Sequence, residues 1–428
     1  MNMYETAGDW KALPAMAVEV KAVVSRTAVL SIFVLSYFWP SVSHAQANNT
    51  IKPGQVLFSS EKLLVSADRR FQLGFFNVSF YSRCLGIRYT NKFYDNIVWV
   101  AKPEETPIYG SNASLTLDTD GLLKITRNGG DPIPLNSNQT APNSVATLEN
   151  TGNLVVKELD LKGSVKRVLW ESFDHPTDTL LPGMKLGKNL RTGKKWILTS
   201  WLTEEIPAPG AFTLEYKHTQ DGSGGVFVIR RRGELYKTWD YNSGIFGLDS
   251  MSYVSNGIES FFNYSRKSGI FGLRLTSDGM ISYGNSSYII IELSDCYGYS
   301  VEHGCVEQRS PMCRSSRERL EPRWGRFLQD MSYSNWYTDD GNTSIGLSDC
   351  WDRCWKNCSC VGFDTLTSDE TGCRFWSKGA KFEQNNDGIG TRIYVLNSSF
   401  PDKSESDNGF DNKWWIWLII STAAVMVV

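Results

Sequence analysis

Cysteines are the residues whose number and spacing point most clearly to chemistry in this chain. The sequence of 428 residues contains 9 cysteines, and all except Cys84 lie between Cys296 and Cys373. This density is typical of a disulfide scaffold formed in an oxidising, extracytoplasmic compartment. The alternative is a zinc site, but the cysteines at positions 350, 354, 358 and 360 form no C-x2-C pair and have no neighbouring histidine. We therefore expect disulfides.

Cys84 stands apart from the other cysteines and has no obvious partner. A buried free thiol that packs as a small apolar side chain is the favoured interpretation. An intermolecular disulfide is the alternative.

Acceptor motifs for N-glycosylation support the same compartment. The pattern Asn-x-Ser/Thr is absent from the hydrophobic ends of the chain and occurs at Asn48, Asn77, Asn112, Asn138, Asn263, Asn285, Asn342, Asn357 and Asn397. Such motifs carry bulky glycans on surface loops of secreted proteins. We expect a secretory glycoprotein.

Motifs for catalysis are missing. The chain has only 4 histidines and lacks the HExxH, GxSxG and GxxxxGK[ST] patterns. The kinase signatures are also absent, so no enzyme activity is expected in these residues. ATP and a divalent metal would be needed only if a kinase domain follows. We expect no metal site and no cofactor in this chain. With 44 Lys+Arg against 46 Asp+Glu, nucleic-acid binding is not expected either.

Short strands are the elements that must position any binding residues. Residues 51–160 alternate short apolar runs with turn signals, including Asp120-Gly121 and Thr151-Gly152-Asn153. Evenly spaced strands of this kind are typical of a sandwich, barrel or prism, so the fold class is mainly β. Residues 347–357 are the exception: they predict a helix capped by Ser348, with Cys350 and Cys354 on one face.

The two ends of the chain predict export and membrane attachment. Residues 27–39 (TAVLSIFVLSYFW) form an apolar core followed by small residues, which is typical of a signal peptide cleaved near Ala45 or Ala47. A first transmembrane helix is the alternative. Residues 414–428 (WWIWLIISTAAVMVV) carry no charge but are too few to cross a bilayer. We expect the sequence to stop inside a transmembrane helix, with a cytoplasmic portion missing; a short C-terminal anchor or a removed lipid-anchor tail is the alternative.

Several motifs resemble one family. Residues 97–101 (IVWVA), 146–156 (ATLENTGNLVV) and 169–187 (LWESFDHPTDTLLPGMKLG) resemble the bulb-type lectin domain of plant S-domain proteins. Residues 198–216 are similar to the S-locus glycoprotein domain, and residues 347–363 (LSDCWDRCWKNCSCVGF) resemble a PAN/apple module. The resemblance implies the ectodomain of a G-type lectin S-receptor-like serine/threonine kinase whose kinase domain lies beyond residue 428.

The resemblance also implies a domain organisation with a β-prism lectin domain, a β-rich second domain and a small α+β module. The expected segments are a signal peptide (1–45), the bulb-type lectin domain (46–168), the S-locus glycoprotein domain (169–295), a reduced cysteine-rich or EGF-like remnant (296–319), the PAN/apple domain (320–397), a juxtamembrane linker (398–413) and a truncated transmembrane helix (414–428). Eight cysteines allow 105 pairings in principle. By resemblance to apple modules, the expected disulfides are Cys350–Cys373, Cys354–Cys360, Cys313–Cys358 and Cys296–Cys305.

Mannose recognition in bulb lectins is associated with the pattern Gln-x-Asp-x-Asn-x-Val-x-Tyr, whose alternate side chains share one face of a strand. In the first corresponding stretch, which starts at Asp118, only Asp120 matches. In the second, which starts at Glu149, only Asn153 and Val155 match. We therefore expect no mannose binding at these degenerate positions. His175 lies in the long motif, where a turn histidine beside a proline is favoured over a catalytic or metal-binding one.

Function and partners follow from the same resemblance. The sequence predicts the extracellular recognition region of a single-pass plasma-membrane receptor-like kinase, concerned with pollen or self-recognition or with defence, that binds a peptide, protein or glycan. The alternative is a kinase-less S-domain glycoprotein that acts as a decoy, co-receptor or anchored or secreted binding protein. An extracellular glycoside-acting enzyme has no motif to support it. A homodimer through the PAN or lectin region is expected, because two-fold symmetry closes with one interface.

Overall fold

The computed structural model describes a mainly β chain. The described residues are 48–399, apart from 62–63, 80–81, 92–95, 110–111, 128, 138, 219–224, 241–249, 266–271, 284–288, 292–310, 316–317, 329–335, 339–341 and 386–390. No helix in this part of the chain is long and apolar enough to cross a membrane. The predicted signal and transmembrane segments, 1–45 and 414–428, lie outside the described residues.

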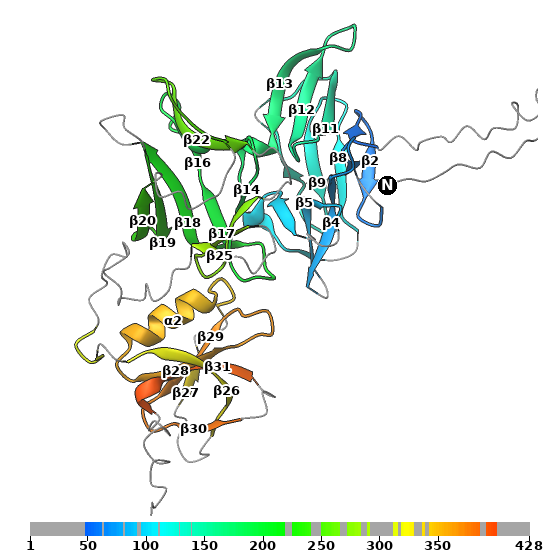
Figure 1. The fold of residues 1–428 in the computed structure, drawn as a ribbon. Helices are drawn as coiled ribbons and strands as arrows, with labels where there is room; N and C mark the ends of the chain where they lie inside the picture. The colour runs from blue at the N-terminus through cyan, green and yellow to red at the C-terminus, as the bar shows by residue number, and fades with distance from the viewer. Residues whose placement is uncertain are drawn as a thin grey trace, which may run out of the picture. The chain divides into compact units, whose positions relative to one another are not determined.

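Three antiparallel sheets form the first β-domain (Figure 1). One sheet joins β1 (Thr50–Ile51), β11 (Ser144–Leu148), β12 (Leu154–Leu159) and β13 (Val165–Glu171). A second joins β10 (Ile133–Pro134), β9 (Leu123–Thr126), β8 (Ser114–Leu117) and β2 (Val56–Phe58). The third joins β3 (Leu64–Val65), β4 (Phe71–Ser79), β5 (Ser82–Tyr89) and β6 (Ile97–Val100), with β7 (Ile108–Tyr109) beside β5; a short 3-10 helix, η2 (Pro103–Glu105), follows β6.

The second β-domain repeats this plan, with three further antiparallel sheets of four strands. Their strands, in sheet order, are β14 (Thr179–Leu180), β23 (Leu273–Leu275), β24 (Ile281–Tyr283) and β25 (Ile289–Ile291); β16 (Lys195–Trp196), β15 (Leu186–Asn189), β22 (Glu259–Ser265) and β21 (Ser250–Ser255); and β17 (Leu198–Trp201), β18 (Pro209–His218), β19 (Gly225–Arg231) and β20 (Glu234–Asp240).

One hairpin shows the repeat at the level of residues. Residues 115–125 (LTLDTDGLLKI) form the β8–β9 hairpin, and residues 273–283 (LRLTSDGMISY) form the β23–β24 hairpin in the same register. Both turns place a glycine in the left-handed region, at φ 89° for Gly121 and 86° for Gly279. Glycine suits this position because it has no Cβ to clash. The sequence prediction of a β-rich second domain did not include this repeat.

The motif at residues 169–187 runs from β13 of the first β-domain into the second β-domain. It passes through η3 (Ser172–Asp174) into β14. The Asp178 side chain is 0% exposed, and its Oδ2 accepts from Arg274 Nε on β23 at 2.9 Å. Arg274 Nη1 also lies 3.0 Å from Glu204 Oε2. The buried Asp178 carboxylate is therefore paired with a fixed cation, as a charge inside a protein requires.

A six-stranded antiparallel sheet and one helix form the C-terminal module, whose strands carry the last colours of Figure 1. In sheet order the strands are β27 (Trp336–Thr338), β29 (Cys373–Ser377), β28 (Cys360–Thr365), β31 (Thr391–Leu396), β26 (Leu320–Leu328) and β30 (Lys381–Gln384), and a 3-10 turn, η5 (Asn397–Ser399), follows β31. The helix is α2 (Leu347–Lys356), with Cys350 and Cys354 buried in a small core that also contains Phe363.

The prediction that Ser348 caps this helix was wrong. Gly346 is the N-cap, in an extended conformation, and Ser348 lies in the first turn. The Asp349 carboxylate accepts from the Gly346 backbone N–H at 3.3 Å and takes the capping role. A carboxylate three residues after the cap also complements the positive end of the helix dipole.

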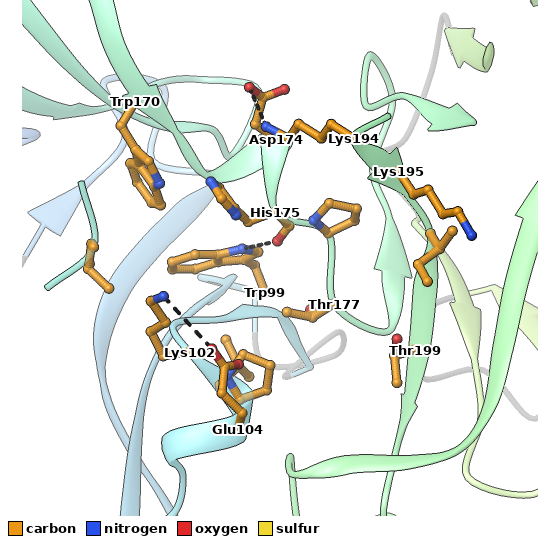
Figure 2. Close-up of a pocket in the computed structure, with 15 residues that line it drawn as sticks. Trp99, Lys102, Glu104, Trp170, Asp174, His175, Thr177, Lys194, Lys195 and Thr199 are labelled. Atoms are coloured by element: carbon orange, nitrogen blue, oxygen red, sulfur yellow. Dashed lines mark hydrogen bonds and ion pairs between the residues drawn. The ribbon is translucent and has the colours of Figure 1, made fainter. Parts of the chain in front are cut away.

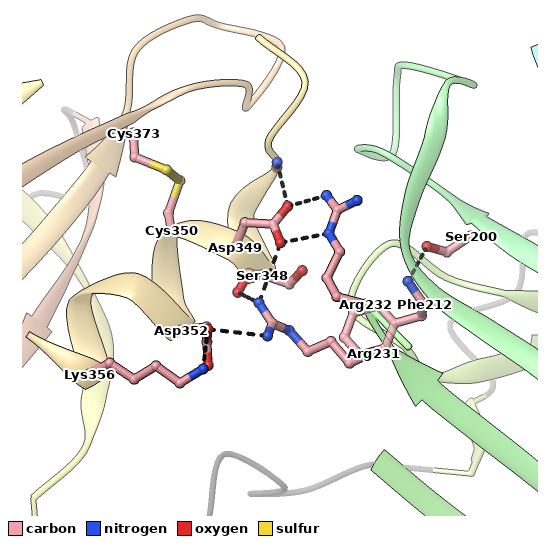
Figure 3. Close-up of polar contacts among 11 residues, drawn as sticks. Ser200, Phe212, Arg231, Arg232, Ser348, Asp349, Cys350, Asp352, Lys356 and Cys373 are labelled. Carbon is pink, nitrogen blue, oxygen red and sulfur yellow. Dashed lines mark hydrogen bonds and ion pairs between the residues drawn. A yellow bond between two sulfur atoms is a disulfide. The ribbon is translucent and has the colours of Figure 1, made fainter. Parts of the chain in front are cut away.

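Ion pairs connect α2 to the end of β19 (Figure 3). Arg232 Nη2 lies 2.6 Å from Asp349 Oδ2, and Arg231 donates to the Ser348 carbonyl at 2.7 Å. Arg231 also lies 3.4 Å from Asp352 and is 8% exposed. Removing one partner of such a buried pair costs more than the pair contributes, because the other charge is left without compensation.

Three disulfides staple the C-terminal module, and they are the pairs that the resemblance implied: Cys313–Cys358, Cys350–Cys373 and Cys354–Cys360. The fourth expected pair, Cys296–Cys305, lies outside the described residues, as does most of the expected cysteine-rich remnant. Cys84 is a buried free thiol that packs against Val100 and Trp201. Burial raises its pKa to about 12, so the thiolate needed for disulfide exchange is suppressed.

Candidate functional site

The first mannose-motif stretch forms the β8–β9 hairpin, where Asp118 is engaged within the protein. Its Oδ2 lies 2.6 Å from Lys124 Nζ, across the turn. The carboxylate of Asp120 accepts from the backbone N–H of Leu122 at 3.1 Å and stabilises the turn. The two acidic groups of this stretch are therefore used by the hairpin itself.

The second stretch shows the same arrangement on the β11–β12 hairpin. Lys157 Nζ lies 2.6 Å from Glu149 Oε1, again across the turn. Asn153 is 5% exposed, donates to Glu171 Oε2 at 2.7 Å and accepts from Ser172 Oγ at 3.0 Å. Val155 is buried in the sheet. The matching residues of this stretch therefore support the β12–η3 connection and leave no polar side chain directed at a ligand.

A pocket of about 430 Å³ lies where β6 and η2 of the first β-domain meet the strands β16 and β17 (Figure 2). Trp99, Trp170 and His175 provide aromatic surface on its wall. The ring centroids of Trp170 and His175 are 5.5 Å apart with an interplanar angle of 21°, and those of Trp99 and Trp170 are 6.0 Å apart, edge to face. Trp99 Nε1 donates to the His175 carbonyl at 2.8 Å, which fixes this group.

Charged side chains surround the aromatic wall. Lys194 Nζ lies 2.9 Å from Asp174 Oδ2, and Lys102 Nζ lies 3.8 Å from Glu104 Oε1. Lys195 is exposed and makes no ion pair with the described residues. Lys102 is also one of the few non-glycine residues with positive φ, at 49°. Strained backbone of this kind concentrates at ligand-binding sites.

The surroundings of His175 disfavour the charged form of its imidazole and lower its pKa. Desolvation by the pocket lowers the pKa of its imidazole, and the nearby charges of Lys194 and Lys102 act in the same direction. Asp174 and Glu104 oppose this effect. A neutral ring stacked on Trp170 can donate or accept a hydrogen bond at neutral pH, which suits binding a polar ligand.

A second, more basic depression of about 760 Å³ continues from this pocket, because Lys195 and Ile197 line both. Lys188 and Arg230 lie on its walls, together with Glu215, which is 3.5 Å from Arg230. We call the two depressions together the junction groove. It combines aromatic surface at one end with an excess of positive charge at the other.

Sequence reasoning placed no ligand in the junction groove. It treated His175 as a turn residue and gave no role to Trp99 or Trp170, although both tryptophans lie in the motifs that carry the resemblance. The signal that could have found them is the tryptophan in each of these two motifs, together with the histidine in the second. The contact between β6 and the chain after β13 could not be inferred from spacing, because it joins residues 76 positions apart.

The predicted glycosylation sites lie mostly on the surface. Asn48, Asn77, Asn112 and Asn342 are exposed, Asn263, Asn357 and Asn397 are half-buried, and Asn138 and Asn285 lie outside the described residues. Within the described part of the chain, no group of three or more histidine, cysteine or acidic residues is arranged to hold a metal ion.

Comparison with known proteins identifies two domains. Residues 96–202 match the family described as D-mannose binding lectin, and residues 327–380 match the PAN-like domain. The lectin match includes all the residues that line the pocket between Trp99 and Thr199.

Relatives of the chain fall into two kinds. The G-type lectin S-receptor-like serine/threonine-protein kinase CES101 of Arabidopsis thaliana is 32% identical over 81% of this chain and 46% of its own length. The S-locus-specific glycoprotein S6 of Brassica oleracea is 28% identical over 86% of this chain and 94% of its own length. The chain thus spans about half the length of the kinase and most of the glycoprotein.

Among solved structures, the chain is similar to the native fetuin-binding Scilla campanulata agglutinin, a two-domain lectin. It is 15% identical over 56% of this chain and 100% of that one, with a TM-score of 0.20.

Proposed function

Because the chain is a homologue of the G-type lectin S-receptor-like serine/threonine kinases and the S-locus glycoproteins, we propose that it is the ligand-recognition ectodomain of a single-pass plasma-membrane receptor. The receptor class would signal in pollen or self-recognition or in defence. The kinase motifs do not occur in this sequence, so catalysis would belong to a kinase domain carried elsewhere in the receptor.

The observation that carries this proposal is the junction groove. Its aromatic end can stack against the apolar faces of a sugar ring or against a peptide side chain, while its lysines can bind oxygen atoms of the ligand. The two mannose-motif hairpins have their polar groups already paired. The ligand would therefore be a glycan, glycoprotein or peptide bound in the groove rather than mannose bound at the hairpins.

Binding of the secreted chain to an array of plant glycans and peptides tests the site. Lys195→Glu reverses an exposed charge that the two depressions share, so it should weaken binding at least about 10-fold without altering the fold. Trp170→Ala should weaken binding by at least as much, because stacking surface is lost.

Two matched variants serve as controls. Lys162→Glu reverses an exposed charge in a turn outside the groove, and Trp324→Ala removes a tryptophan that is 46% exposed in the C-terminal module. Both should bind like the unmodified chain. Equal losses in the groove variants and their controls would contradict the site.

A kinase-less S-domain glycoprotein is the second candidate, and the relative that favours it is the S-locus-specific glycoprotein, of which the chain covers 94%. Such a protein would act as a decoy, co-receptor or anchored or secreted binding protein. Sequencing the transcript through its 3′ end separates the candidates: a kinase reading frame supports the receptor, and an immediate stop supports the glycoprotein.

We also propose the domain limits 46–168, 169–295 and 320–397 and a homodimer formed through the PAN or lectin region. A two-fold dimer uses the same surface twice, and membrane attachment would concentrate a weak interface. Cross-linking on cells and sedimentation of residues 46–413 test the dimer. Monomer alone in both measurements, with and without an identified ligand, would exclude it.

A further inference from the structure

The asparagines of two N-glycosylation motifs line one depression of the first β-domain. Asn77 on β4 and Asn112 before β8 both line a hollow of about 880 Å³, although they lie 35 positions apart in the sequence. The other walls include Phe58, Phe75 and Arg83. Asn48, which also belongs to this domain, does not line it.

The strand geometry aims Asn77 at aromatic surface. Phe75 and Asn77 are alternate residues of β4 in a regular part of its pairing with β5, so their side chains share one face of the sheet. Phe75 is half-buried against the main core, whereas Asn77 is exposed where that core reaches solvent. Arg83 is the direct cross-strand neighbour of Asn77.

Phe58 adds an exposed aromatic side chain to the wall of this hollow. Its side chain belongs to β2, pairs across the ladder with Ser114 on β8 and is 55% exposed. This exposed phenylalanine leaves apolar surface in contact with water beside the hollow. An asparagine-linked sugar in the same hollow could cover this surface, because the C–H face of a pyranose ring is apolar.

We propose that the chain carries an N-linked glycan at Asn77 whose first N-acetylglucosamine residues pack on Phe58 and Phe75 and close this end of the β-domain. Arg83 lies beside the linkage, where its guanidinium can donate to the acetamido or hydroxyl oxygens of the sugar. The proposal rests on the extracellular location proposed above, since only a secreted chain meets the glycosylation machinery.

Glycopeptide mass spectrometry of the full chain expressed in plant cells tests occupancy. Asn77 should be occupied in most molecules. If every motif is unmodified, the extracellular location fails; if other motifs are occupied but Asn77 is not, only the present proposal fails. A glycan on Asn112 alone would also overturn it.

Thermal unfolding tests the packing. Enzymatic removal of glycans from the folded chain should lower its Tm by about 2–4 °C. Asn77→Gln should reproduce most of this loss, whereas Asn48→Gln, at another exposed motif of the same domain, should not. Deglycosylation of the intact protein keeps the test valid even if the Asn77 variant fails to fold.

Phe58→Ala separates packing from a general effect of glycosylation. In this variant the Tm should respond to deglycosylation by less than half as much as in the unmodified chain, because the stacking surface is gone. An equal response with and without Phe58 would show that the glycan does not pack there and would overturn the proposal.

Discussion

The mannose-motif hairpins and the junction groove differ in how completely their polar side chains are paired within the protein. At the hairpins, Asp118 is paired with Lys124 and Glu149 with Lys157, each at 2.6 Å across a turn. In the groove, Lys195 has no acidic partner among the described residues, and the aromatic rings of Trp170 and His175 face an open cavity. Similar residue types therefore have different availability in the two regions.

This difference teaches that a hairpin turn and a sugar site make separate demands on the sequence. A hairpin turn needs a glycine and a few backbone hydrogen bonds, which both hairpins retain. A sugar site needs unpaired polar groups on one face, and at both hairpins a lysine on the neighbouring strand pairs with the acidic group. The residues of the groove lie outside the two hairpin turns, so they can be substituted without altering those turns.

The largest expected effect concerns the ion pair between Asp178 and Arg274, which supports the motif that lines the groove. Asp178→Asn leaves Arg274 without its fully buried carboxylate, and the motif that lines the groove loses its ion pair with β23. We expect the free energy of unfolding to fall by about 3–5 kcal/mol. Chemical denaturation measures the change, and Asp131→Asn, at an exposed acid in the first β-domain, is the control. A loss below about 1 kcal/mol would contradict the anchoring role.

The next effect concerns Asn153, which matches the mannose motif but is used internally. Asn153→Ala removes an amide that bonds to Glu171, Ser172 and the Phe173 backbone, so several buried groups lose partners. We expect a loss of about 2–3 kcal/mol in the free energy of unfolding. Lys124→Ala, which breaks only a half-exposed ion pair, should cost about 0.2–1 kcal/mol. Equal losses would mean that Asn153 is not structural.

Mannose affinity should be negligible in the unmodified chain. Because Leu122, Lys124 and Thr126 occupy positions of the mannose motif, and Lys124 pairs with Asp118, a mannose column should not retain the protein. A variant with the full motif restored in this stretch is the positive control for the column. Specific elution of the unmodified chain by free mannose, lost in Asp120→Ala, would contradict this prediction.

Local patterns predicted much of this molecule. Alternating apolar residues and Asp-Gly turns gave the mainly β class and the hairpins, and the resemblance gave the three disulfides that staple α2 and its neighbours. The second domain was expected to be β-rich, but its three-sheet plan was missed because its sheets join strands distant in sequence, such as β14 with β23. The groove was missed for the same reason, and Ser348 was mistaken for a cap because Asp349 reaches back to Gly346 instead.

The smallest expected effect is the pH dependence that His175 gives to the folding stability of the chain. The folded chain holds the pKa of His175 below its ordinary value of 6.5, because desolvation and the neighbouring lysines disfavour the imidazolium. The unfolded chain therefore takes up the proton first as pH falls, and folding stability is lost progressively below about 6.5. The Tm of the unmodified chain should fall relative to that of His175→Gln below this pH, and the difference should be constant above about pH 7.5. A difference that is independent of pH, or that changes in the opposite direction, would show that the groove does not disfavour the charged ring.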